Sequence, residues 1–212
     1  MSMLSEEARR AIRTENADAL AKRGYRTCGW LPLIGEGGLR GASEIADRAA
    51  VMSILLYAAH KCTTPAEAAE WIDRNNLYDA LSPCETAALE SLDEDDLIPF
   101  TWYAESLCAL SWLCNGSSDP DPDVPVDADI MDGFPDPRSD ADASCIGFTE
   151  LRSEAEAYRM LDLLYNAHWF LVDERVAGRA NADREGVVYE RRKALEWAFD
   201  AELEWDDVPM DA

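Results

Sequence analysis

The sequence contains few positively charged residues. In 212 residues, nineteen lysines and arginines stand against forty-three aspartates and glutamates, so the formal net charge is -24. Lysine is the scarcer cation, with three residues against sixteen arginines. Binding to a phosphate backbone requires clustered basic side chains, so this shortage argues against direct nucleic-acid binding.

Histidine is also scarce, and the cysteines lack a metal-binding pattern. There are two histidines, and the six cysteines at positions 28, 62, 84, 108, 114 and 145 include no Cys-x-x-Cys pair. We therefore expect neither a structural zinc site nor any other metal or cofactor site. Several cysteines lie among apolar residues, where free thiols act as small hydrophobic groups in a reducing compartment. The charged segment 1–15 has no signal-peptide pattern, and a cytoplasmic location is expected.

No long apolar segment is present. Between Leu97 and Ser118 the only charged residue is Glu105, but Pro99 and several polar residues shorten the apolar length, and basic anchors are missing from the flanks. These features argue against a membrane span. We expect no association with a membrane.

Phosphate-binding and calcium-binding motifs are missing as well. The glycine-rich run 35–38 has neither a strand before it nor a lysine after it, as a phosphate loop would. Asp127, Asp129 and Asp132 are similar to an EF-hand loop, but the spacing is wrong and Arg138 stands at the twelfth position. No catalytic residue is assigned on these grounds.

What the chain does contain is a series of helix patterns. Apolar residues make up 48% of the composition and seven residues are tryptophan, so a compact core is expected. Seven helices are predicted: five at about 5–23, 43–62, 99–114, 153–178 and 185–201, and two that start at Thr64 and Ser82. No segment alternates like a strand. The predicted fold is a single all-α domain, 1–212, with N-terminal helices in 1–114 and C-terminal helices in 150–212.

Local signals place several of these helices. Thr64-Pro65-Ala66-Glu67 and Ser82-Pro83-Cys84-Glu85 each combine a hydroxyl at the N-cap, a proline at the first helical position and a glutamate at the third. This pattern predicts two capping boxes. Ser153 starts the long sixth helix in a similar way. The apolar run 30–34 lies in a glycine-rich loop, and we expect it to dock on the core.

Segment 115–149 is an acidic loop rich in aspartate and proline, with Arg138 as its only basic residue. A loop this long inside a compact domain is usually functional or disordered. Its aspartates form the candidate partner-binding surface: Asp119, Asp121, Asp123, Asp127, Asp129, Asp132 and Asp136. Segment 202–212 is predicted to be an acidic tail.

Three polar residues fall where a helical wheel requires a hydrophobic one. Glu105 is expected to pair with an arginine, and Arg192 with Glu105, Asp206 or Asp207. His168 lies on the stripe of the long helix without a glutamate or histidine one turn away, so it does not mark a metal site. Glu105, His168, Arg192 and Asp206 form a candidate buried polar cluster, for which a structural role is favoured over catalysis.

The pattern resembles the bacterial family known as domain of unknown function 4272. The resemblance rests on Trp102, Glu105 and Trp112; Tyr165, His168 and Trp169; residues 187–188, 190–192, 194–195 and 197; and Trp205-Asp206-Asp207-Val208, with a looser match at Leu31-Pro32 and Arg48. Family members typically end in aspartate and threonine, whereas this chain ends in Asp211 and Ala212. The resemblance implies a soluble helical protein and supports the same embedded polar residues, but it implies no activity.

The charge distribution favours a protein-binding function. Acidic clusters at 85–96, 119–142 and 196–211 would attract a basic protein partner, as expected of an inhibitor or immunity protein that neutralises a basic toxin or enzyme. Two alternatives remain open. One is an enzyme that uses Glu105, His168 and Arg192 in a cleft, and the other is a protein whose charge serves solvation only. The sequence leaves the oligomeric state open.

Overall fold

The computed structural model describes residues 4–35 and 37–211. Within these residues the α-helices are α1 Glu6–Lys22, α2 Ala42–Ala59, α3 Pro65–Arg74, α4 Pro83–Ser91, α5 Tyr103–Leu113, α6 Glu154–Val176 and α7 Ala182–Phe199. Short 3₁₀ helices join them: η1 Tyr78–Ala80, η2 Glu94–Trp102, η3 Ala128–Gly133, η4 Ala143–Cys145 and η5 Trp205–Asp207. The only β pairing among the described residues is an isolated bridge between Gly38 and Asp200. The prediction of an all-α fold is confirmed.

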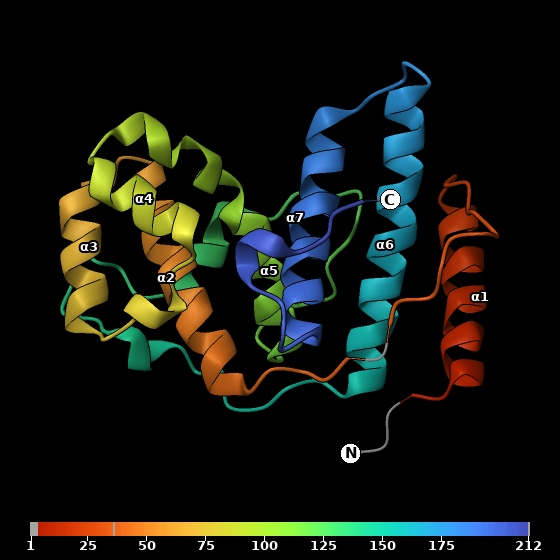
Figure 1. The fold of residues 1–212 in the computed structure, drawn as a ribbon, viewed down its shortest axis with the longest axis horizontal. Coiled ribbons are helices and arrows are strands. Elements are labelled where there is room, and N and C mark those ends of the chain that lie inside the picture. Colours follow the sequence, from red (N-terminus) through yellow and green to blue (C-terminus); the bar gives the residue numbers. More distant parts are fainter. Residues whose placement is uncertain (1–3, 36, 212) are drawn as a thin grey trace.

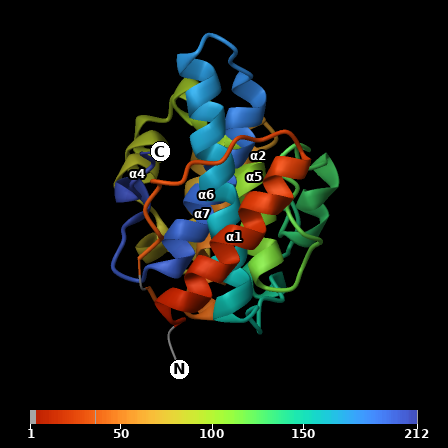
Figure 2. The ribbon, with the colours of Figure 1, turned by 90° about the vertical axis from the view of Figure 1, so that its right-hand side faces the viewer.

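The helices form a row in which each packs on the next (Figure 1). α1 lies against α6, α6 against α7, α7 against α5 and α5 against α2, while α3 covers α2 at the other end. Figure 2 shows the α1 end of the row, with α6 and α7 behind it. Because α5 and α7 lie inside the row, polar groups on their contact faces are shielded from water.

Side-chain caps determine where most helices begin. Thr64 and Ser82 each form a complete capping box, as predicted, and Ser153, which was predicted only to start a helix, forms a third. Ser5 caps α1. α7 starts earlier than predicted, because the Asn181 side chain accepts a hydrogen bond from the backbone N–H of Arg184.

The predicted helix 99–114 is divided in two. Residues Glu94–Trp102 form the 3₁₀ helix η2, and the α-helix starts at Tyr103. Pro99 lies inside η2. Proline has no N–H to donate and its ring clashes with the preceding turn of an α-helix, so the turns that start at Glu94 could not continue through Pro99 as an α-helix.

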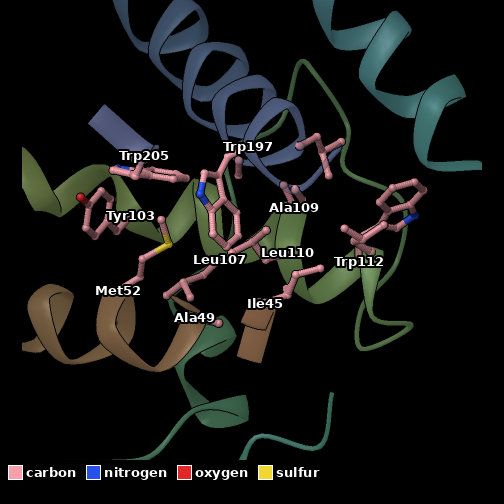
Figure 3. Close-up of a cluster of buried hydrophobic side chains, with 14 of the residues drawn as sticks. Ile45, Ala49, Met52, Tyr103, Leu107, Ala109, Leu110, Trp112, Trp197 and Trp205 are labelled. Atoms are coloured by element: carbon pink, nitrogen blue, oxygen red, sulfur yellow. The ribbon is translucent and has the colours of Figure 1, made fainter. Parts of the chain in front are cut away.

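The core is continuous from α1 to the C-terminal segment. Figure 3 shows Ile45, Ala49 and Met52 of α2 beside Leu107 and Leu110 of α5, with Trp197 of α7 above them. Trp205 extends this cluster: its ring centroid lies 6.0 Å from those of Trp197 and Tyr103, edge to face in each case.

Segment 202–212 is therefore more than an acidic tail, because Trp205 and Val208 are buried in the core. The apolar loop 30–34 docks on the core as predicted through Leu31 and Ile34, but not through Trp30. Leu31 is buried, whereas Trp30 is 76% exposed and touches the ring of Trp169 edge to face. Trp30 and Leu31 are neighbours in an irregular segment, and of these two side chains only that of Leu31 is buried in the core.

Candidate functional site

Glu105 and Arg191 form a buried ion pair between α5 and α7. Glu105 Oε2 accepts a hydrogen bond from Arg191 Nε at 2.8 Å and lies 2.6 Å from Arg191 Nη2. Their side chains are 6% and 2% exposed. The prediction that Glu105 pairs with a buried arginine is correct, but the arginine is Arg191, and the proposed pairing with Arg192 is wrong. The register of α7 points the side chain of Arg191 at α5.

This pair also holds the acidic loop in place. Arg191 donates to the main-chain oxygens of Asp121, at 2.6 Å, and Val124, at 3.0 Å. The backbone N–H of Val126 donates to Glu105 Oε1 at 3.0 Å. The ion pair thus satisfies three main-chain groups of the loop, which explains why a segment with little regular structure has a defined path.

Arg192 lies on the other side of α7, between α6 and the C-terminal segment. Its Nε donates to Glu196 Oε1 at 2.7 Å, and Nη1 lies 2.7 Å from His168 Nδ1. A guanidinium can only donate, so Nδ1 of His168 must be the unprotonated acceptor. Burial, and then the charge of Arg192, lower the pKa of His168 to about 4. The histidine is therefore neutral at physiological pH.

Arg192 also fastens the C-terminal segment. It donates to the main-chain oxygens of Asp211, at 3.0 Å, and Pro209, at 3.3 Å, and its guanidinium carbon lies 4.4 Å from the ring centroid of Tyr165. Burial raises the pKa of Glu196, while Arg192 opposes that rise. Arg192, His168 and Glu196 thus hold residues 209–211 in place, and we call these three residues the Arg192 clamp.

The four candidate residues do not form one cluster. Glu105 belongs to the pair with Arg191, and His168 and Arg192 belong to the clamp. Asp206 is exposed, and its carboxylate accepts the backbone N–H of Cys84 at 2.9 Å, in the first turn of α4. Burial of this carboxyl would raise its pKa, but hydrogen bonds from Cys84 and Ser82 bring it below its usual value.

Two further buried ionic networks were not predicted. Glu85 accepts two hydrogen bonds from Arg48, at 2.6 and 2.7 Å, and one from the Tyr103 hydroxyl at 2.6 Å. On the other side of the molecule, Asp162 of α6 accepts Nε of Arg13 at 2.6 Å. The sequence places Glu85 in a capping box and at the start of the acidic cluster 85–96, and neither pattern reveals that this carboxylate is buried.

The seven candidate aspartates of the acidic loop fall into two groups. Four of them bind other side chains of the protein. Asp119 accepts the Trp112 indole N–H at 2.7 Å. Asp121 and Asp123 form ion pairs with Arg23, and Asp136 forms one with Arg138 at 2.7 Å. Asp123 also accepts the Tyr25 hydroxyl at 2.8 Å and pairs with Arg184. Burial would raise the pKa of Asp123, but the Tyr25 hydroxyl and the two arginines lower it.

The second group of loop aspartates is Asp127, Asp129 and Asp132, on and beside η3. All three are exposed, and their side chains make no hydrogen bond or ion pair with any other described residue. We call these three residues the free acidic edge. The candidate acidic surface is therefore partly neutralised within the chain and partly available.

Within residues 4–35 and 37–211, no group of three or more histidine, cysteine, aspartate or glutamate side chains is arranged to hold a metal ion. No helix in that part of the chain is long and apolar enough to cross a membrane. The six cysteines are all free thiols.

The fold and these contacts define an all-α protein with structural ion pairs in its interior and a partly unpaired acidic surface. A family model described as "Domain of unknown function (DUF4272)" matches residues 12–208, which is almost the entire chain. The protein therefore belongs to the DUF4272 family. No curated protein and no solved structure matches the chain significantly.

Proposed function

We propose that this protein is an acidic helical binding module for a basic protein, of the kind that acts as an inhibitor or immunity protein against a basic toxin or enzyme. The main support is that the positive charges of the chain are largely paired with its own carboxylates. Most of the arginines form ion pairs within the chain, including the buried pairs of Arg48, Arg191 and Arg192. The excess carboxylates therefore have no cationic partner among the described residues, and a basic protein could replace the solvent cations around them.

The free acidic edge is the part of the surface best suited to this role. It projects from a loop that Arg191 and Glu105 hold at its base, so its carboxylates are presented on a fixed main chain. Prearranged charge speeds the encounter with an oppositely charged partner, although the field fades beyond about 8 Å at physiological salt. Binding should therefore be fast and salt-sensitive.

The other two hypotheses receive less support. An enzyme built on Glu105, His168 and Arg192 needs these side chains in one accessible cleft, whereas His168 is 2% exposed and Glu105 is bonded to Arg191. Charge that served solvation alone would not require Arg191 to fix the acidic loop. The free thiols suit a reducing compartment such as the cytoplasm, and this location is part of the proposal.

Affinity capture at low and moderate salt tests the proposal. The wild-type protein is compared with the triple variant Asp127→Asn, Asp129→Asn, Asp132→Asn. A control variant, Glu7→Gln, Asp18→Asn, Glu70→Gln, removes the same number of charges from exposed positions on α1 and α3. We expect the wild type and the control to capture the same basic protein, and the loop variant to capture much less of it.

Moderate salt should weaken the capture by the wild type and the control. Recovery of no basic protein at either salt concentration would contradict the proposal. Equal recovery by the two variants would mean that net charge, not the free acidic edge, attracts the partner.

A further inference from the structure

A pocket of about 240 Å³ opens beside the Arg192 clamp. It lies between α6 and α7 on one side and two irregular segments on the other, namely residues 33–35 with Gly37 and parts of residues 200–211. The volume is several times the ~30 Å³ that one water molecule occupies in the liquid, yet below the ~300 Å³ typical of the smallest drug-sized sites. The pocket therefore suits one side chain or a group of similar size.

The walls of the pocket are mostly apolar. Leu33 and Ile34 line it from the N-terminal segment, Leu161 from α6, Phe199 from α7 and Leu203 from the C-terminal segment. Such walls favour an occupant with an aliphatic stem, because contact with them removes apolar surface from water. A purely ionic occupant would gain nothing from them.

The charges that line the pocket are predominantly negative. Glu196, Asp200 and Asp211 contribute carboxylates, while Arg192 is the only basic residue among the lining residues. Asp200 and Asp211 form no ion pair with a described residue, and Asp211 is exposed. A net excess of two carboxylates remains at the pocket.

Arg192 is not available to attract an anion. Its nitrogens already donate to Glu196, His168, Asp211 and Pro209, which leaves at most one of its five N–H groups free. An anion entering the pocket would meet two unpaired carboxylates and an arginine that is already neutralised by Glu196. A cation would meet the carboxylates without a competing free charge.

We propose that this pocket binds a long cationic side chain, arginine or lysine, of the basic protein partner. The aliphatic stem lies against the apolar walls, and the charged head reaches Asp200 and Asp211. The inference rests on the proposed function, because the side chain is the partner's, but it assigns a second contact site away from the free acidic edge. A buried cationic anchor surrounded by weaker contacts is a common form of interface hot spot.

The probes are N-acetyl-arginine amide and N-acetyl-lysine amide, with N-acetyl-citrulline amide as a neutral control of the same shape as the arginine probe. Each is titrated into the full-length ¹⁵N-labelled protein at low salt, and amide shifts are followed by NMR. We expect one or both cationic probes to shift resonances around Gly35, Gly37 and Tyr165, and the citrulline probe to leave them unchanged.

The pocket variant is Asp200→Asn, Asp211→Asn. Asparagine at position 200 still accepts the backbone N–H of Glu202, and the carbonyl of residue 211 still accepts Arg192, so the fold should persist. The matched control is Glu204→Gln, Asp207→Asn, which removes two exposed charges from the same segment. Loss of two partly exposed charge pairs should weaken binding of the cationic probe about tenfold in the pocket variant only.

Equal binding of the citrulline probe, equal loss in both variants, or no shift with any probe at tens of millimolar would overturn the inference. The two experiments distinguish an error in the pocket inference from an error in the proposed function. If the pocket variant captures the basic partner as well as the wild type does, the inference is wrong and the proposed function stands. If the cationic probes bind but no partner is captured, the proposed function fails while the pocket remains a cation site.

Discussion

At the scale of single residues, the ionised groups in the interior determine how the molecule responds to mutation. Glu105 with Arg191 and Arg48 with Glu85 are nearly fully buried pairs. Burying two charges costs about as much free energy as their attraction returns, so the pair adds little net stability. Removing one partner is different, because an uncompensated charge is then left without water.

The Glu105→Gln substitution tests this at the base of the acidic loop. It should lower the free energy of unfolding by about 3–5 kcal/mol, since Arg191 would remain buried without a carboxylate. Denaturant unfolding measures the loss, and amide exchange at Val126 should become faster. The same substitution at the exposed Glu70 is the control. A loss comparable to that of the control would show that Arg191 is satisfied by main-chain oxygens alone.

His168 gives the molecule a specific dependence on pH. Its pKa is about 4 in the folded chain, against about 6.5 in an unfolded chain. Between these values the unfolded state binds a proton that the folded state does not, so stability is fully present above pH 6.5 and falls as the pH drops towards 4. The expected loss over this window is roughly 3 kcal/mol.

Unfolding by urea at several pH values between 7 and 4 measures this slope. The His168→Gln variant lacks the titrating group, so its stability should depend less on pH across the same window. The exposed His60 serves as the control, and His60→Gln should keep the wild-type slope. Parallel curves for wild type and His168→Gln would show that carboxylates alone cause the acid sensitivity.

At the scale of helices, two similar sequences perform different tasks. Both Glu67 and Glu85 close a capping box. Glu67 is exposed and bonded only to Thr63 and Thr64, whereas Glu85 is fully buried against Arg48 and Tyr103. The same motif therefore only starts a helix in one case, at the surface, and in the other case also joins three helices in the interior.

The Glu85→Gln and Glu67→Gln substitutions separate these tasks. Glu85→Gln leaves Arg48 buried without a negative partner, and we expect a loss of about 3–5 kcal/mol in the free energy of unfolding. Glu67→Gln retains an acceptor for the cap at the surface, and the unfolding midpoint should hardly move. Thermal and denaturant unfolding of the two variants side by side make the comparison. Similar losses would place both glutamates in the same structural role.

The same contrast explains what the sequence could and could not predict. Periodicity and caps are local, so the all-α fold and the capping boxes at Thr64, Ser82 and Ser153 were predictable. Partner choice is not local: Arg191 and Arg192 are adjacent and both buried, and only the packing of α7 between α5 and α6 decides which of them meets Glu105. The docking of Trp205 was missed because the surrounding acidic residues suggested a solvated tail.

At the scale of the whole molecule, the C-terminal segment completes the core. Trp205 packs on Trp197 and Tyr103, and its ring also lies 4.4 Å from the guanidinium carbon of Arg48 and 4.6 Å from Lys193 Nζ. These contacts connect α2, α5 and α7. The segment that follows α7 therefore supports α2 and α5, two helices that lie far from it in the sequence.

Trp205→Ala should lower the free energy of unfolding by about 3–5 kcal/mol, the usual cost of removing a large buried side chain. Calorimetry or denaturant unfolding measures the effect. Glu204→Gln with Asp207→Asn changes the exposed neighbours on both sides of the tryptophan and should leave stability near that of the wild type. A Trp205→Ala protein as stable as this control would mean that the segment is an accessory to the core.

The contact between α1 and α6 imposes an order on events during biosynthesis. α1 buries Ile12 and Leu20, and Arg13 pairs with Asp162 of α6, but residues 23–153 separate the two helices. At a translation rate of ~5–20 residues per second, α1 leaves the ribosome on the order of ten seconds before its partner. α1 is thus made well before the helix on which it docks, and its apolar stripe must stay soluble in the nascent chain until α6 emerges.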